Sequence, residues 1–146
     1  MKLALKEAQK AFDKGEVPIG AVIVKDDKVL SRAYNLREIK NDACSHAEIL
    51  AIKKACKKIN NWRLDGCDMY VTLEPCAMCA GAILNARIKN LYIVAMEPRS
   101  GAVGSKINLL ENYTYNHKTN YETGILGEEA KEMMQKFFKN VRNKSK

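Results

Sequence analysis

Residues 69–86, Met-Tyr-Val-Thr-Leu-Glu-Pro-Cys-Ala-Met-Cys-Ala-Gly-Ala-Ile-Leu-Asn-Ala, place a strand directly before a helix. The apolar, partly β-branched run 69–73 predicts a buried strand, and the small and apolar residues of 77–86 predict a helix. A second apolar run at 91–95 follows and predicts the next strand. A strand, a helix and a strand in this order are typical of the crossover unit that joins parallel strands, which indicates an α/β protein.

The rest of the chain extends this unit in both directions. An amphipathic helix is predicted at 2–14, a hairpin at 18–34 with a polar turn at 25–28, and a largely buried helix at 46–58. After residue 95 we expect a loop, a short helix near 107–111, a strand near Tyr121 and a long helix over 126–141. Parallel pairing is expected between strands that a helix connects. The prediction is a three-layer α/β/α sandwich with a mixed, mainly parallel five-stranded sheet.

Length and composition limit the possible classes. A chain of 146 residues and 16.4 kDa is expected to form a single domain over 1–146, and 47% hydrophobic with 29% charged residues is the ordinary globular range. No apolar run approaches the roughly 20 residues of a membrane helix. Met1-Lys2-Leu3 leads into charged residues rather than into a secretory signal. We therefore expect a cytoplasmic protein with no membrane partner.

The charge balance favours an anionic partner. There are 25 basic and 17 acidic residues, which gives a formal net charge of +8 and a pI of about 9.3. Residues 131–146 hold six basic side chains against one acidic side chain. A basic helix of this kind is by default a solvated face, but it also suits the phosphates of RNA, and binding of that kind weakens as salt rises.

The cysteine pattern indicates a metal site. Five cysteines in a chain without an export signal argue against a disulfide framework. Cys76 and Cys79 are three apart at the start of a predicted helix, so their sulfurs share one face, and the helix N-terminus favours thiolates. Together with His46 they make three zinc ligands, the number that leaves a position for water, whereas structural zinc takes four. Cys44 lies too close to His46 for comfortable joint ligation, and His117 falls in an irregular region.

Glu48, two residues after His46, is the candidate proton carrier of such a site. Zinc lowers the pKa of bound water, and a nearby carboxylate can take the proton and pass it on. Positions two apart on a regular helix point to opposite sides, so the pair requires the first turn of the helix. The competing interpretation is a capping box, in which Glu48 bonds back to the Ser45 amide.

The two motifs, His-x-Glu at 46–48 and Pro-Cys-x-x-Cys at 75–79, form the signature of the zinc nucleobase deaminases. Beyond them, further stretches resemble bacterial tRNA-specific adenosine deaminases nearly from end to end. These are the stretches 16–22, 34–35, 72–81, 101–105, 116–117 and 124–126.

The resemblance implies a cytidine-deaminase-like fold and a homodimer that converts the wobble adenosine of a tRNA anticodon loop to inosine. It implies one Zn²⁺ per subunit on His46, Cys76 and Cys79. A zinc-activated hydroxide would attack the base, with Glu48 as the proton shuttle. Asn35 matches a position that hydrogen-bonds the base, and Glu97 matches an acidic residue that contacts a ribose.

Two other functions stay open at this point. The first is deamination of a free base or nucleoside such as guanine or cytosine/cytidine, because the catalytic core is shared. The second is a structural zinc or RNA-binding module without turnover.

Glu97-Pro98-Arg99 stands where the resembled family usually has Asp-Pro-Lys, so the acidic side chain is longer by one methylene. We expect Phe137 and Phe138 to divide between core and dimer surface rather than to stack on bases.

Overall fold

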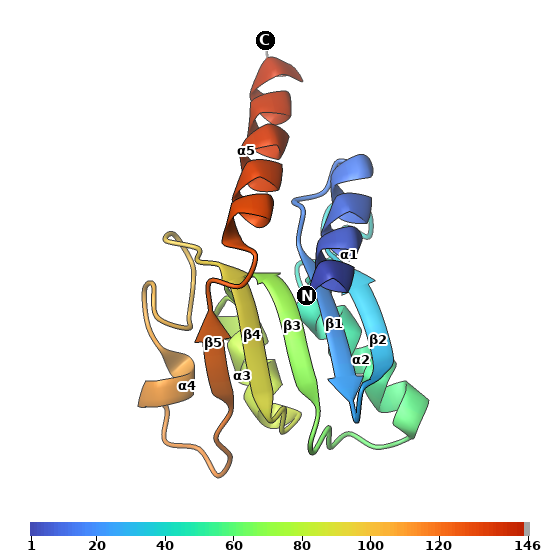
Figure 1. Cartoon of the computed structure of the whole chain (residues 1–146), viewed down its shortest axis with the longest axis vertical. Coiled ribbons are helices and arrows are strands. Elements are labelled where there is room, and N and C mark those ends of the chain that lie inside the picture. Colours follow the sequence, from blue (N-terminus) through green and yellow to red (C-terminus); the bar gives the residue numbers. More distant parts are fainter. Residues whose placement is uncertain (145–146) are drawn as a thin grey trace.

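Within residues 1–144, which the computed structural model describes, five strands form one sheet (Figure 1). Their order across the sheet is β2-β1-β3-β4-β5. The basic residue Lys146, counted above in the C-terminal segment, lies outside the described residues. The strands are β1 (Gly20–Lys25), β2 (Lys28–Tyr34), β3 (Asp68–Leu73), β4 (Asn90–Ala95) and β5 (Asn120–Thr123).

The sheet is mixed, as the sequence predicts. β4 runs parallel to β3 and β5 runs parallel to β4, whereas β1 is antiparallel to both of its neighbours. Four strands therefore point one way and β1 alone points the other way. The expected parallel pairing of β2 with β3, which a helix connects, is wrong. The two strands run in the same direction, but β1 lies between them. The physical reason is that β1 is the more buried strand of the hairpin and takes the interior position, while β2 is left at the edge.

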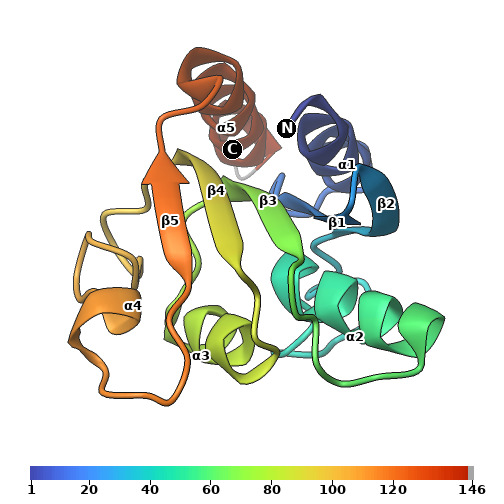
Figure 2. The ribbon, with the colours of Figure 1, turned by 60° about the horizontal axis from the view of Figure 1, so that its bottom comes forward.

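Helices cover both faces of the sheet, which confirms the three-layer prediction (Figure 2). α1 and α5 lie on one face, and α2 and α3 lie on the other with the short α4 beside them. No helix in the described part of the chain is both long and apolar enough to cross a bilayer. The helices are α1 (Lys2–Asp13), α2 (Ala47–Ile59), α3 (Ala77–Asn85), α4 (Leu109–Asn112) and α5 (Gly127–Lys144).

Small residues let α1 approach the sheet closely. Ala4 and Ala8 are fully buried against β1. A Cβ on Gly20 would lie 2.1 Å from the carbonyl oxygen of Ala4, so only glycine fits at this contact. The opposite layer is a conventional core of interdigitated side chains, with Ile23 and Met69 fully buried.

α5 leaves the sheet and projects beyond it, so that the C-terminal half of this helix stands clear of the strands (Figure 1). Its contact with α1 is aromatic. Phe137 is buried, and its ring lies 5.9 Å from that of Phe12 in an edge-to-face arrangement. Phe138 is 45% exposed. The predicted core position of one of these two adjacent phenylalanines is thus confirmed for Phe137.

Candidate functional site

The N-termini of α2 and α3 meet at one point. His46 is the N-cap of α2 and Cys76 is the N-cap of α3, both with extended backbone, and Cys79 lies one turn into α3. The Nδ1 atom of His46 is 3.7 Å from Sγ of Cys76 and 3.6 Å from Sγ of Cys79. The three donor atoms all lie within 4.8 Å of one another. Three side chains from two distant segments therefore converge on a space the size of one ion.

The donor set fits zinc. With Zn–N near 2.0–2.1 Å and Zn–S near 2.3 Å, a tetrahedral site places nitrogen and sulfur about 3.6 Å apart. The two separations given above agree with this value. Within residues 1–144 no histidine, cysteine or carboxylate joins these three side chains as a fourth ligand. Cys44 is exposed, and the Nε2 atom of His117 lies 2.8 Å from the carbonyl oxygen of Ile88 instead.

The protonation of the three side chains also suits a cation. A hydrogen bond from the Cys79 thiol, helped by contact with His46, lowers the pKa of Cys76 to about 4. The pKa of Cys79 is raised, because its thiol serves Cys76 as donor and because it is buried. The interaction with Cys76 raises the pKa of His46. These shifts favour the thiolate form of Cys76, which is the form that binds a metal ion.

Glu48 is a buried carboxylate with a free oxygen. It is the second residue of α2 and is 3% exposed, and within the described residues its Oε1 atom has no hydrogen-bond partner. Burial raises the pKa of Glu48. The capping box does not form, because the Ser45 amide donates to the Asp42 carbonyl at 3.1 Å rather than to Glu48, and the N-cap is His46. Glu48 thus occupies the first turn of α2, as the pairing with His46 requires.

A pocket of about 190 Å³ opens beside this cluster. Asn35 lies in its wall, where its Nδ2 donates to the carbonyl of Val17 at 3.4 Å and its Oδ1 accepts from the amide of Arg37 at 3.2 Å. Glu97 lines the pocket from the opposite loop. The pocket lining thus includes every candidate site residue except the buried Cys79, whose Sγ lies 3.6 Å from Nδ1 of His46. The lining side chains include His46, Glu48, Cys76, Asn35, Glu97 and Phe138.

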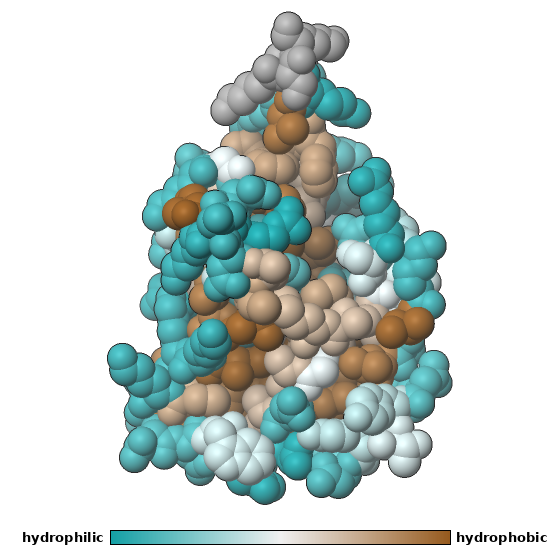
Figure 3. All heavy atoms as spheres, turned by 180° about the vertical axis from the view of Figure 1, so that it is seen from behind, coloured by the Kyte–Doolittle hydropathy of each residue, from teal (hydrophilic) through white to brown (hydrophobic). Residues whose placement is uncertain are grey.

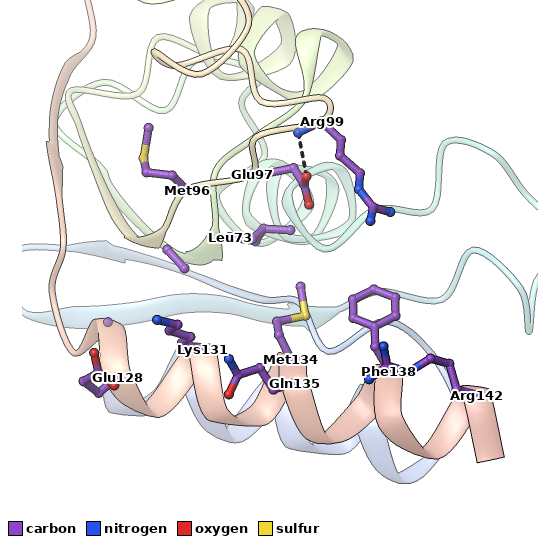
Figure 4. Close-up of a pocket in the computed structure, with 12 residues that line it drawn as sticks. Leu73, Met96, Glu97, Arg99, Glu128, Lys131, Met134, Gln135, Phe138 and Arg142 are labelled. Carbon is purple, nitrogen blue, oxygen red and sulfur yellow. Dashed lines mark hydrogen bonds between the residues drawn. The ribbon is translucent and has the colours of Figure 1, made fainter.

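A wider groove of about 660 Å³ runs from this pocket along α5 (Figure 4). Leu73, Glu97 and Phe138 line both cavities. Met134 and Phe138 give the groove an apolar wall along α5, and its basic side chains are Arg99, Lys131 and Arg142.

The sequence reasoning missed several pocket residues. Val17, Arg37 and Ser100 line the pocket but belong to no predicted site, and Phe138 lines it although the sequence predicts a core or dimer-surface position for it. Arg37 could have been suspected from its place two residues after Asn35. The spacing of Phe138 four residues after Met134 indicates a shared helix face, but not what that face borders.

An apolar surface lies behind the sheet. Seen from that side, hydrophobic atoms gather over the middle of the molecule, where α2 and α3 form the outer layer (Figure 3). Met78 on α3 is 37% exposed, and Ile49 and Ile52 on α2 are only half buried. Large contiguous apolar patches on a protein surface often mark sites of contact with another molecule.

Comparison with known proteins gives consistent matches over the whole chain. Residues 1–142 match the family model of the MafB19-like deaminases. The tRNA-specific adenosine deaminase of Bacillus subtilis (strain 168) is 47% identical over 146 residues, which are 100% of this chain and 91% of that protein.

Solved structures agree. One, from studies of A-to-I editing by tRNA:A34 deaminases at the wobble position of transfer RNA, has a TM-score of 0.88 and 45% identity over 91% of this chain and 96% of that chain. The guanine deaminase of Bacillus subtilis has a TM-score of 0.65 and 31% identity over 97% of this chain and 90% of that chain.

Proposed function

The chain belongs to the tRNA-specific adenosine deaminases within the MafB19-like deaminases, and from this premise we propose that it converts the wobble adenosine of a tRNA anticodon loop to inosine. The reaction takes up one water and releases the exocyclic amine as ammonia. Such an enzyme works in the cytoplasm, where its substrate is found. The observation that carries the proposal is the convergence of His46, Cys76 and Cys79 beside one pocket, together with Glu48, whose Oε1 has no hydrogen-bond partner within the described residues.

One Zn²⁺ per subunit would be held by His46, Cys76 and Cys79. When bound, it supplies Lewis acidity that brings the pKa of a water molecule toward neutrality. The absence of a fourth ligand among residues 1–144 favours a site open to water over a closed structural site, and so disfavours a module without turnover.

Glu48 moves the protons in this proposal. Its free oxygen takes a proton from the attacking water, gives it to the ring nitrogen of the base, and later carries one to the departing amine. A carboxyl group whose pKa is raised by burial exchanges protons more readily near neutral pH than an exposed one. Asn35 donates and accepts hydrogen bonds at the edge of the base, and Glu97 accepts from the ribose.

The groove along α5 is proposed to hold the RNA on either side of the target base. Arg99, Lys131 and Arg142 offer cations to phosphates, and Phe138 offers a ring on which a base can stack. This proposed role differs from the expectation that the two phenylalanines divide between core and dimer surface rather than stack on bases. Single-stranded loops with splayed bases are the RNA elements that such combined surfaces recognise.

The test is turnover of the zinc-loaded protein on an anticodon stem-loop with adenosine at the wobble position. Inosine at that position and an equal amount of ammonia are expected. A stem-loop with guanosine at the same position is the matched control. The absence of inosine from the adenosine stem-loop would overturn the proposal.

Deamination of a free base is the second candidate, because a guanine deaminase is 31% identical over nearly the whole chain. Guanine, cytidine and adenosine are therefore tested in parallel. Salt separates the candidates further. Activity on the stem-loop falls as salt rises because phosphate contacts are lost, whereas turnover of a neutral free base does not depend on such contacts.

We also propose that two copies of the chain form a homodimer through the apolar face of α2 and α3. Met78 and the half-buried isoleucines of α2 would be covered there, as is usual for obligate contacts. Light scattering is expected to give twice the chain mass, and Met78→Glu is expected to reduce it to the mass of one chain. A wild-type protein with the mass of one chain would contradict the homodimer.

A further inference from the structure

A buried carboxylate ties down the loop that follows β4. Glu74, at the end of β3, is 3% exposed. Its Oε1 accepts from the amide of Glu97 at 2.9 Å and from the hydroxyl of Ser105. Its Oε2 accepts from the amides of Val103 and Ser105 at 2.9 and 3.0 Å. All four donors belong to residues 97–105, so one side chain holds both ends of this loop.

The loop backbone passes unusually close to this carboxylate. A Cβ built on Gly101 would lie 2.2 Å from Cδ of Glu74, so only glycine allows the approach. The loop is closed on itself by the hydrogen bond from the Gly101 amide to the Glu97 carbonyl at 2.9 Å, and it is joined to Pro75 by the Ala102 amide at 2.8 Å. Hydrogen bonds to a carboxylate are among the stronger ones in proteins, and leaving their buried donors unpaired is costly.

From this arrangement we infer that Glu74 is a positioning residue for RNA recognition, which acts by fixing the backbone of Glu97 at the rim of the pocket. The inference rests on the proposed function, in which Glu97 contacts the ribose. Glu74 does not itself touch the RNA in this account. The backbone amide of Glu97 donates a hydrogen bond to Glu74. The Oε1 atom of Glu97 accepts from the Arg99 amide at 2.8 Å. Without the anchor, the Glu97 carboxylate loses its defined place.

Glu74→Gln is the sharpest probe because it keeps the size of the side chain. If the new NH₂ group takes the place of Oε2, two amides lose their acceptor, those of Val103 and Ser105. If it takes the place of Oε1, the Ser105 hydroxyl can rotate and accept, and only the Glu97 amide is left unpaired. The second orientation is the less costly one, so the substitution chiefly releases Glu97.

The experiment is a double-mutant cycle on the zinc-loaded enzyme with the adenosine stem-loop. Glu74→Gln and Glu97→Gln are each expected to raise KM about tenfold, with kcat changed less than threefold, because a binding contact to a charged group is lost. The double variant is expected to be no worse than Glu97→Gln alone. Additive losses in KM, or a fall in kcat with KM unchanged, would overturn the inference.

Glu7→Gln is the matched control. Glu7 is also 3% exposed and engaged by a cation, Lys10, but it lies on α1 and does not line the pocket. It is expected to leave KM unchanged. Ser105→Ala removes a single donor to Glu74 and serves as a milder second variant, with a smaller rise in KM that is again absent in the Glu97→Gln background.

Hydrogen exchange tests the anchor without reference to activity. The amide of Glu97 is expected to exchange at least tenfold faster in Glu74→Gln, whereas the amides of Val103 and Ser105, which keep their acceptor, change less. Zinc content stays at one per chain. Unchanged exchange would overturn the inference even in an active enzyme. If the wild-type protein fails to act on the stem-loop, the proposed function fails, whereas protection of these amides still decides whether Glu74 holds the loop.

Discussion

Nδ1 of His46 lies 3.6 Å from Sγ of Cys79, although 33 positions separate the two residues in the chain. The contact follows from the topology. α2 follows β2 and α3 follows β3, and these two strands point the same way on either side of β1. Both helices therefore begin at the carboxyl ends of these strands, and both lie on the same face of the sheet. Ligand sites in α/β sheets generally lie at the carboxyl ends of the strands.

Loss of one ligand is expected to remove the metal. Cys79→Ser should lower bound zinc from one per chain to less than a tenth, because the hydroxyl is a much weaker zinc ligand than a thiolate. Elemental analysis of the purified protein measures this. Cys44→Ser is the control, since Cys44 is exposed and outside the cluster, and it should retain full zinc. A zinc-loaded Cys79→Ser protein would contradict the ligand assignment.

Glu48→Gln is expected to keep its zinc and to lose about 10²–10⁴-fold in kcat, the usual contribution of a general acid–base group. The same change should raise the melting temperature of the metal-free protein, because it removes a buried carboxylate whose Oε1 lacks a partner in the described structure. Single-turnover kinetics and thermal melts give the two readings. If the Glu48→Gln enzyme were fully active, Glu48 would not be the proton carrier and would have only a packing role.

Removing cations from the groove should reduce the salt dependence of RNA binding. Each lost phosphate contact lowers the magnitude of the slope of log K against log salt by about 0.7–0.9. Arg142→Ala is expected to show this, since Arg142 lines the groove along α5. Lys89→Ala, an exposed cation before β4, removes the same charge away from the groove and should leave the slope unchanged. Equal slopes for both variants would argue against a phosphate contact at Arg142.

Gly20→Ala is expected to lower the free energy of unfolding by about 1–3 kcal/mol, the usual cost of overpacking. The added methyl group has no room, because it meets the backbone of Ala4 and Ala8 at 2.1 and 2.5 Å. Urea unfolding followed by circular dichroism measures the change. An unchanged midpoint would mean that α1 does not pack against β1 as closely as described.

Asp42 makes the stability of the loop before α2 depend on pH. The Cys44 amide and the Ser45 hydroxyl donate to its carboxylate at 2.9 and 2.8 Å and hold the pKa of Asp42 below its usual range. This stabilisation is full above the unfolded pKa of about 3.9 and disappears as pH falls through the lowered folded value. Asp42→Asn should therefore be less stable than wild type at pH 7, with a gap that closes in acid. Urea midpoints across pH 2–7 test this, and a constant gap would contradict it.

Much of the site was visible in the sequence because its signals are local. The motifs at 46–48 and 75–79 each lie at the start of a predicted helix, and helix starts are marked by short-range composition. The first-turn position of Glu48, which the sequence could state only as a condition, is met because His46 is the N-cap. The capping box suggested by Ser45 is not formed, since the Ser45 amide donates to the Asp42 carbonyl.

The two loop anchors were invisible beforehand. Glu74 directly precedes the Pro-Cys-x-x-Cys motif, but nothing in the sequence indicates what its side chain binds. Glu16 accepts from the amides of Glu38 and Ile39 at 3.0 and 2.9 Å, more than twenty residues away. A sequence pattern cannot reveal such a glutamate, because every residue except proline has a backbone amide and the partners follow no periodic spacing. Phe138 escaped for a similar reason, because helical spacing shows which face a residue shares but not what that face borders.

By itself, the sequence determined the order of helices and strands, the α/β class and the set of side chains able to bind a metal, since each depends on periodicity or on residues close together in the chain. Only the tertiary structure decided that β1 separates β2 from β3, that His46 meets Cys79, and that Glu74 and Glu97 share one loop anchor. These are contacts across many residues. Their energy comes from burial and hydrogen bonding in the assembled fold, which local patterns do not encode.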